Sequence, residues 1–174
     1  MKPYHRYAIE LTPFRKARIP IARFQCRRSR RTFSLLPYQL IPYCQYTVSA
    51  VVGTILTVLE ARERGQRGFY GAWKQVDPDS DVTPWLIACW LAVVVKGLRR
   101  AHPTLCTRYD LTGIRSGAGG NPLGAELKIY LKAFGAWPPS VGADALGAII
   151  KSYSGLSRQF LFGTPSQMRR LCTT

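Results

Sequence analysis

Apolar residues in the middle of the chain repeat with the period of a helix. Over residues 47–64, six apolar side chains recur at intervals of three and four, which places them on one helical face. They are Val48, Val51, Val52, Ile55, Leu56 and Leu59. Thr47 can cap the start of this helix and Gly65 can end it. The pattern therefore predicts an amphipathic helix over residues 47–64.

Five further helices follow from similar segments and their boundaries. They are predicted over residues 68–76, 83 to about 100, 123–134, 142–153 and, more briefly, 156–162. Thr83 followed by Pro84 is typical of a helix start, and Pro103 is expected to stop the long helix near residue 100. Most of the chain after residue 46 is therefore predicted to be helical.

The start of the chain has a different period. Residues 4–11 and 18–26 are rich in aromatic and β-branched residues that nearly alternate with polar ones, which predicts two strands. Pro20 marks an edge position, and a shift of the alternation at Ile21 and Ala22 predicts a β-bulge. The predicted fold class is mainly α: a small helical domain, similar to a helix-turn-helix unit, after a short N-terminal β-hairpin.

Charge is unevenly distributed along the chain. The 174 residues carry 25 Lys and Arg against 9 Asp and Glu, a net charge of +16. Residues 1–36 contain ten of the basic residues and a single acidic residue. We therefore divide the chain into a basic β-arm (1–36), a three-helix domain (37–112) and a C-terminal helical extension (113–174). A strong positive charge predicts a polyanionic partner, either nucleic acid or an anionic membrane surface.

Several classes of protein are disfavoured by composition. A hydrophobic fraction of 47% argues against a disordered basic tail. The apolar run 85–95 ends at Lys96, too early for a membrane span, and predicts a core helix instead. Residues 29–36 resemble a twin-arginine export signal, but Pro37 and Pro42 interrupt its apolar part, so an exported or membrane-bound form stays an alternative. We expect a cytoplasmic protein that does not bind membranes.

Candidate catalytic and metal-binding groups are sparse. The five cysteines form no C-x-x-C pair, which favours a reduced compartment and argues against a zinc site. His5 and His102 have no recognisable nucleophile partner, and the glycine-rich segment 113–122 lacks a phosphate-binding motif. We therefore expect a protein that is not an enzyme, with no metal, no cofactor and no small-molecule substrate.

The most distinctive segment is rich in arginine. Five arginines lie within nine residues: Arg23, Arg27, Arg28, Arg30 and Arg31. Arginine forks bind phosphate through two hydrogen bonds, and the flanking Phe24 and Phe33 can anchor the segment or stack on bases. A solvated basic strand without a ligand is the alternative. We predict that these arginines bind DNA.

A second basic group lies near the end of the long predicted helix. Helices at 47–64, 68–76 and 83–100 have the lengths of a helix-turn-helix unit. However, the first turn of the last helix is apolar, whereas a recognition helix is polar there. A buried central helix therefore explains this segment at least as well as a DNA-reading helix does. If this helix touches DNA, the contacts are Lys96, Arg99 and Arg100, which would bind phosphates without reading sequence.

Residues 18–37 resemble the second half of a small zinc ribbon found in bacterial insertion-sequence proteins. The string Arg31-Thr32-Phe33-Ser34-Leu35-Leu36-Pro37 is its most specific part, and a weaker likeness continues to about residue 110. In this transposon-associated family of unknown function, a C-x-x-C-x-R-T-F-S-L-L-P segment precedes a helix-turn-helix. Here Ser29 stands at the second cysteine and no cysteine precedes Cys26, so the ribbon is degenerate.

The leading hypothesis is a non-enzymatic DNA-binding protein of mobile-element, transposase-related origin. The alternative is a protein-interaction or scaffold module, in which Trp73, Trp85 and Trp90, if exposed, would anchor a partner chain or a second copy in a homodimer. A decayed transposon remnant without activity is a further alternative.

Overall fold

A computed structural model gives the arrangement of the chain. It describes residues 4–10, 15–37, 40–42, 44–65, 71, 73–74, 82–112, 114, 122–136, 139–157 and 159–162, with side chains described throughout except at 4–10, 15, 17 and 139–146. The helices are α1 (Val48–Glu63), α3 (Pro84–Leu105), α4 (Leu123–Ala133) and α5 (Pro139–Ser157), and the strands are β1 (Tyr4–Glu10), β2 (Arg15–Gln25) and β3 (Thr32–Leu35). The predicted mainly helical fold with an N-terminal β-hairpin is confirmed.

Helix α1 forms as its apolar period predicts. All six apolar residues of the predicted stripe are buried. The Thr47 hydroxyl oxygen accepts a hydrogen bond from the backbone N–H of Ala50 at 3.1 Å, which satisfies a donor that the first turn leaves unpaired. Gly65, with a φ of +94°, follows the last turn in the left-handed conformation that glycine adopts without strain.

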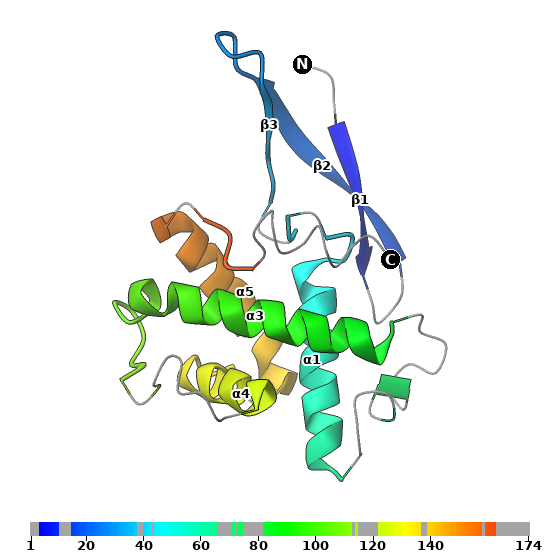
Figure 1. Ribbon diagram of the computed structural model, residues 1–174, viewed down its shortest axis with the longest axis vertical. Helices are drawn as coiled ribbons and strands as arrows, with labels where there is room; N and C mark the ends of the chain where they lie inside the picture. Colours follow the sequence, from blue (N-terminus) through cyan, green and yellow to red (C-terminus); the bar gives the residue numbers. More distant parts are fainter. Residues whose placement is uncertain are drawn as a thin grey trace.

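Helices α1, α3, α4 and α5 share one core, and we call them the helical body. Helix α3 is its central helix. It lies across α1, α4 and α5 and contacts all three (Figure 1). Buried residues recur along its whole length: Ile87, Trp90, Leu91, Val94, Val95, Gly97, Leu98, Ala101 and Leu105. They join residues of the other helices in one hydrophobic core, so the segments predicted as 37–112 and 113–174 pack together. The interpretation of α3 as a buried central helix is therefore confirmed.

The end of the long central helix differs from the prediction. Helix α3 does not stop near residue 100: Pro103 lies inside it, and it ends at Leu105. A proline this close to the end removes one backbone donor, while the next turn still closes through a bond from the Cys106 N–H to the His102 carbonyl at 2.9 Å. Burial of Leu105 in the core holds this last turn in place.

The other differences concern the C-terminal half and the second helix. Helix α5 extends to Ser157, and no separate helix forms at the described part of 156–162. Leu161 and Phe162 instead enter the core from an irregular segment. Most of the predicted helix 68–76 lies outside the described residues, which include only Gly71, Trp73 and Lys74 there. The helix-turn-helix therefore stays a prediction.

The strands form an antiparallel sheet with β2 in the middle. The first part of β2 pairs with β1, from Tyr4 opposite Ile21 to Glu10 opposite Arg15. Its last four residues pair with β3, from Ala22 opposite Leu35 to Gln25 opposite Thr32. Among the described strands, each part of β2 pairs along one side only, which suits Pro20 because this residue cannot donate a backbone hydrogen bond. The sequence did not predict β3.

The predicted bulge at Ile21 and Ala22 falls where β2 changes partner, since Ile21 pairs with β1 and Ala22 with β3, so the bulge stays a prediction. The two sides of this junction carry their apolar residues on different faces of β2. Ile19 and Ile21 share one face of β2 and pack with Leu36 and Leu40 in a small cluster. Phe24 lies on the opposite face and is exposed. An apolar residue there breaks the pattern without breaking the strand.

The sheet projects from the helical body. Figure 1 shows β2 and β3 rising away from the helices, with the turn between them at the outer end. The cluster around Ile21 and Leu40 lies at the other end of this hairpin, and β3 is exposed along its full length. Among the described residues, no helix has the length and apolar character that crossing a membrane requires.

Candidate nucleic-acid interface

The turn between β2 and β3 is held by its own hydrogen bonds. The Cys26 N–H donates to the Arg31 carbonyl at 2.8 Å, and the Arg30 N–H donates to the Cys26 carbonyl at 2.9 Å. The Gln25 side-chain amide also donates to the Arg30 carbonyl at 3.0 Å. Arg30 has a φ of +57°, a left-handed conformation that costs about 1–2 kcal/mol for a residue with a Cβ. The hydrogen bonds offset this cost and fix the shape of the turn.

Four of the predicted arginines lie on this turn. Arg27, Arg28, Arg30 and Arg31 are exposed, and none of them forms an ion pair with a described carboxylate. Arg23, on the adjacent part of β2, is also exposed and donates to the Thr32 hydroxyl across the hairpin at 3.4 Å. The structure therefore brings all five predicted arginines to the outer end of the hairpin. We call the turn itself, residues 26–31 with four of these arginines, the arginine turn.

Cys26 begins the arginine turn and has an altered thiol. The Ser29 backbone N–H lies 3.5 Å from its sulfur. Hydrogen bonds from the Ser29 side chain and from the backbone of Ser29 and Arg28 lower the pKa of the Cys26 thiol, since they stabilise the thiolate. Nowhere in the described part of the chain do three or more His, Cys, Asp or Glu side chains gather as a metal site would require. Cys26 thus stands without a set of companion ligands there.

An aromatic pair lies directly beside the arginine turn. Phe24 and Phe33 are opposite each other in the β2–β3 register. Their rings are stacked, with centroids 5.4 Å apart and an interplanar angle of 17°. They remain 39% and 52% exposed, so they contribute little to the core. Sequence reasoning identified both residues but not their pairing, because β3 was not predicted.

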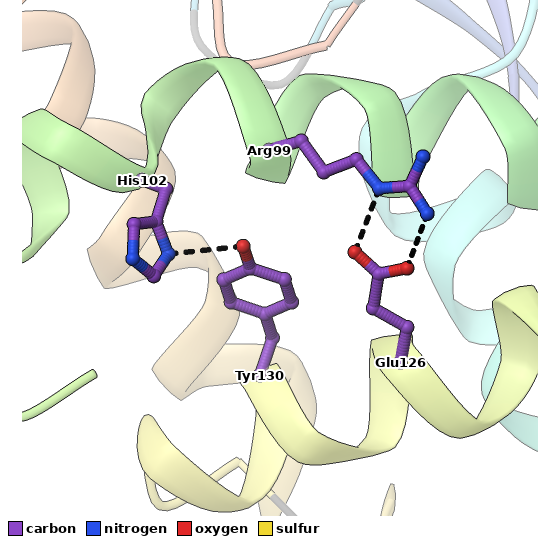
Figure 2. A network of polar contacts seen from close by, with 4 residues as sticks. All are labelled: Arg99, His102, Glu126 and Tyr130. Carbon is purple, nitrogen blue, oxygen red and sulfur yellow. Dashed lines mark hydrogen bonds and ion pairs between the residues drawn. The ribbon is translucent and has the colours of Figure 1, made fainter. Parts of the chain in front are cut away.

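The second predicted group of basic residues divides. Lys96 is exposed on α3. Arg99 instead donates to both carboxylate oxygens of Glu126 on α4, at 2.8 and 2.5 Å (Figure 2). Arg100 donates to the backbone carbonyls of Phe160 and Leu161 at 2.7 and 3.2 Å. Both arginines therefore hold parts of the helical body together, and we leave them out of the interface.

The Arg99–Glu126 pair is one half of a polar contact between α3 and α4. The other half joins His102 Nδ1 and the Tyr130 hydroxyl at 3.0 Å, as Figure 2 shows. The Glu126 hydrogen bond is the largest cause of a raised pKa for Arg99. Because Glu126 and Tyr130 are buried and bonded to α3, the contact fixes how α4 lies on α3. Glu126 falls among apolar helix positions in the sequence, which is the signal that could have revealed it.

The tryptophans predicted as partner anchors differ in exposure. Trp73 and Trp90 are buried in the core, and the Trp90 ring also packs edge-on against Tyr46 with centroids 4.8 Å apart. The exposure that an anchor requires is therefore absent at these two residues. Trp85 is 54% exposed in the first turn of α3.

Neither family models nor curated protein sequences nor solved structures produce a match for this chain. The resemblance to insertion-sequence proteins consequently stays a prediction that rests on residues 18–37.

Proposed function

We propose that this protein binds nucleic acid without catalysing a reaction, and that the β2–β3 hairpin is an arm that grips phosphates. The observation that carries the proposal is the arginine turn itself. Four arginines share one turn at the outer end of a projecting hairpin, exposed and without a described carboxylate to neutralise them. Such a concentration of positive charge attracts a polyanion.

The fixed backbone of the turn strengthens this proposal. Like charges repel one another in the free protein, and binding phosphates relieves that repulsion. Because hydrogen bonds already hold the backbone between Cys26 and Arg31, less backbone conformational freedom is lost when a ligand binds. Guanidinium groups bind phosphate oxygens in pairs, which a flexible run of lysines does not do. Lys96 is a secondary candidate contact on the helical body.

The resemblance to insertion-sequence proteins makes DNA the polyanion to test first. Fluorescence anisotropy with a random labelled duplex, titrated from low to high salt, measures the number of phosphates neutralised. Four phosphate contacts predict a slope of log K against log salt of about −3.6. The variant with Arg27→Gln, Arg28→Gln, Arg30→Asn and Arg31→Gln should lose most of this slope. Asparagine is used at position 30 because it tolerates the left-handed conformation.

A matched control removes the same charge elsewhere. Arg27→Gln with Arg28→Gln should reduce the magnitude of the slope by about 1.8. Lys132→Gln with Lys151→Gln removes two exposed charges from the helices and should change the slope by much less. Equal effects of the two pairs would show that net charge alone attracts DNA. Absence of binding by the unaltered protein at low salt would refute the proposal.

A further inference from the structure

The aromatic face of the β2–β3 hairpin has no role in the core. Phe24 and Phe33 are stacked and exposed, and Leu35 continues the same face at 58% exposure, opposite Ala22. All four residues of β3 are exposed. Exposed apolar side chains are common singly, but an in-register stacked pair that continues into a third apolar residue forms a surface. Such a surface usually serves contact with a ligand.

This surface is turned away from the contacts that attach the sheet. Residues of β2 alternate between two faces, and the face with Ile19 and Ile21 packs with Leu36 and Leu40. Phe24 belongs to the other face. It is also two residues from Cys26, where the arginine turn begins, a separation of about 7 Å along a strand. A ligand on the aromatic face therefore lies within reach of the guanidinium groups.

We propose that Phe24 and Phe33 form a stacking platform for unpaired bases, so that the hairpin prefers single-stranded nucleic acid to duplex. This inference rests on the proposed function, because the arginine turn supplies the phosphate contacts. A single strand offers both a chain of phosphates and open base faces, and the hairpin offers a complementary charge beside aromatic rings. In a duplex, the base faces are covered by their neighbours and only phosphates and base edges are accessible.

Competition between matched probes tests the preference. A labelled thymidine dodecamer should bind the full chain at least about fivefold more tightly than a duplex of equal length. Phe24→Leu with Phe33→Leu should weaken binding of the dodecamer by about 5- to 150-fold, the usual range for removing one stacked base. Binding of the duplex should stay within about twofold, and the salt slope should not change. Phe24→Tyr with Phe33→Tyr keeps the rings and should retain the affinity.

Several results would overturn the platform. They are equal losses for single strand and duplex, no loss for either probe, or tighter binding of the duplex by the unaltered protein. A 5-methyluridine dodecamer, which differs from the thymidine dodecamer only by its 2′-hydroxyl groups, identifies the preferred sugar when measured in parallel. Tighter binding of either single strand than of duplex supports the proposal. If duplex binding depends on the arginine turn while the leucine variants bind normally, the platform fails and the proposed function stands. If the unaltered protein binds no nucleic acid, both fail.

A second measurement needs no variant. A dodecamer that contains 5-bromodeoxyuridine, irradiated in complex with the unaltered protein, forms a covalent bond to a residue in contact with the base. Mass spectrometry should place the adduct on the peptide that contains Phe24 or Phe33. Adducts confined to the helices would contradict the platform, even if the leucine variants proved unstable.

Discussion

Arginine and aromatic side chains have different surroundings in the helical body and on the β2–β3 hairpin. On α3, Arg99 and Arg100 are bonded to a carboxylate and to backbone carbonyls. On the hairpin, Arg27 and Arg28 meet no described carboxylate. Trp90 is buried among the helices, while Phe33 stacks in the open. In the body, such residues contribute to the packing of the helices, whereas on the hairpin they stay exposed.

The largest expected contrast is in the free energy of unfolding. Trp90→Ala removes a large side chain from the core and should cost about 3–5 kcal/mol. Phe33→Ala removes a half-exposed ring from the hairpin and should cost less than about 1 kcal/mol. Urea denaturation followed by circular dichroism measures both. A comparable loss from the two variants would mean that the hairpin and the body share one core.

The two groups of arginines should differ next. Arg99→Met leaves the buried carboxylate of Glu126 without its partner. Breaking a fully buried pair costs about 3–5 kcal/mol, and partial exposure of Arg99 reduces the expected loss to about 2 kcal/mol. Arg28→Met on the hairpin should leave stability unchanged and weaken binding of nucleic acid. A loss of stability in Arg28→Met together with an unchanged stability of Arg99→Met would contradict this difference. Glu126→Gln should have a stability between those of the two arginine variants.

A smaller loss of stability is expected where Leu161 and Phe162 pack against α3. A Cβ at Gly97 would lie 2.3 Å from the Leu161 carbonyl oxygen, closer than real contacts allow. Gly97→Ala must therefore displace the backbone that Arg100 also holds, at a cost of about 1–3 kcal/mol. Gly53→Ala is the control, since a Cβ there meets nothing within 4 Å and alanine favours a helix. Equal melting temperatures for the two variants would contradict this close approach.

The smallest expected difference is chemical. Hydrogen bonds lower the pKa of the Cys26 thiol on the hairpin, whereas burial raises the pKa of the Cys89 thiol on α3. A lower pKa gives more thiolate at a given pH, so Cys26 should react with iodoacetamide at a lower pH than Cys89. Mass spectrometry of protein alkylated between about pH 6 and pH 11 would measure both midpoints. A higher midpoint for Cys26 would contradict the hydrogen-bonded turn.

Local patterns in the sequence were sufficient for several elements. The apolar period and Thr47 predicted α1, because a helix cap and a buried stripe depend on neighbouring residues. Thr83 and Pro84 likewise marked the start of α3. Its end was misjudged, because burial of Leu105 outweighs the effect of Pro103 and depends on residues far away in the chain.

The candidate interface was only partly visible in the sequence. The five arginines and the two phenylalanines could be read directly, since their composition is unusual within so short a segment. That Phe24 stacks on Phe33 depends on the pairing of β2 with β3. Arg99 and Arg100 resembled the hairpin arginines in the sequence. Their partners lie 27 and about 60 residues further along the chain, and no local pattern shows them.

The sequence by itself determined the mainly helical character, the concentration of positive charge near the start of the chain and the caps of two helices. These properties arise from residue type and short-range spacing. Only the tertiary structure decided which arginines stay exposed without a described carboxylate partner and which apolar residues stay outside the core. Both depend on long-range contacts, because a charge is neutralised, and a side chain buried, by whatever the fold brings beside it.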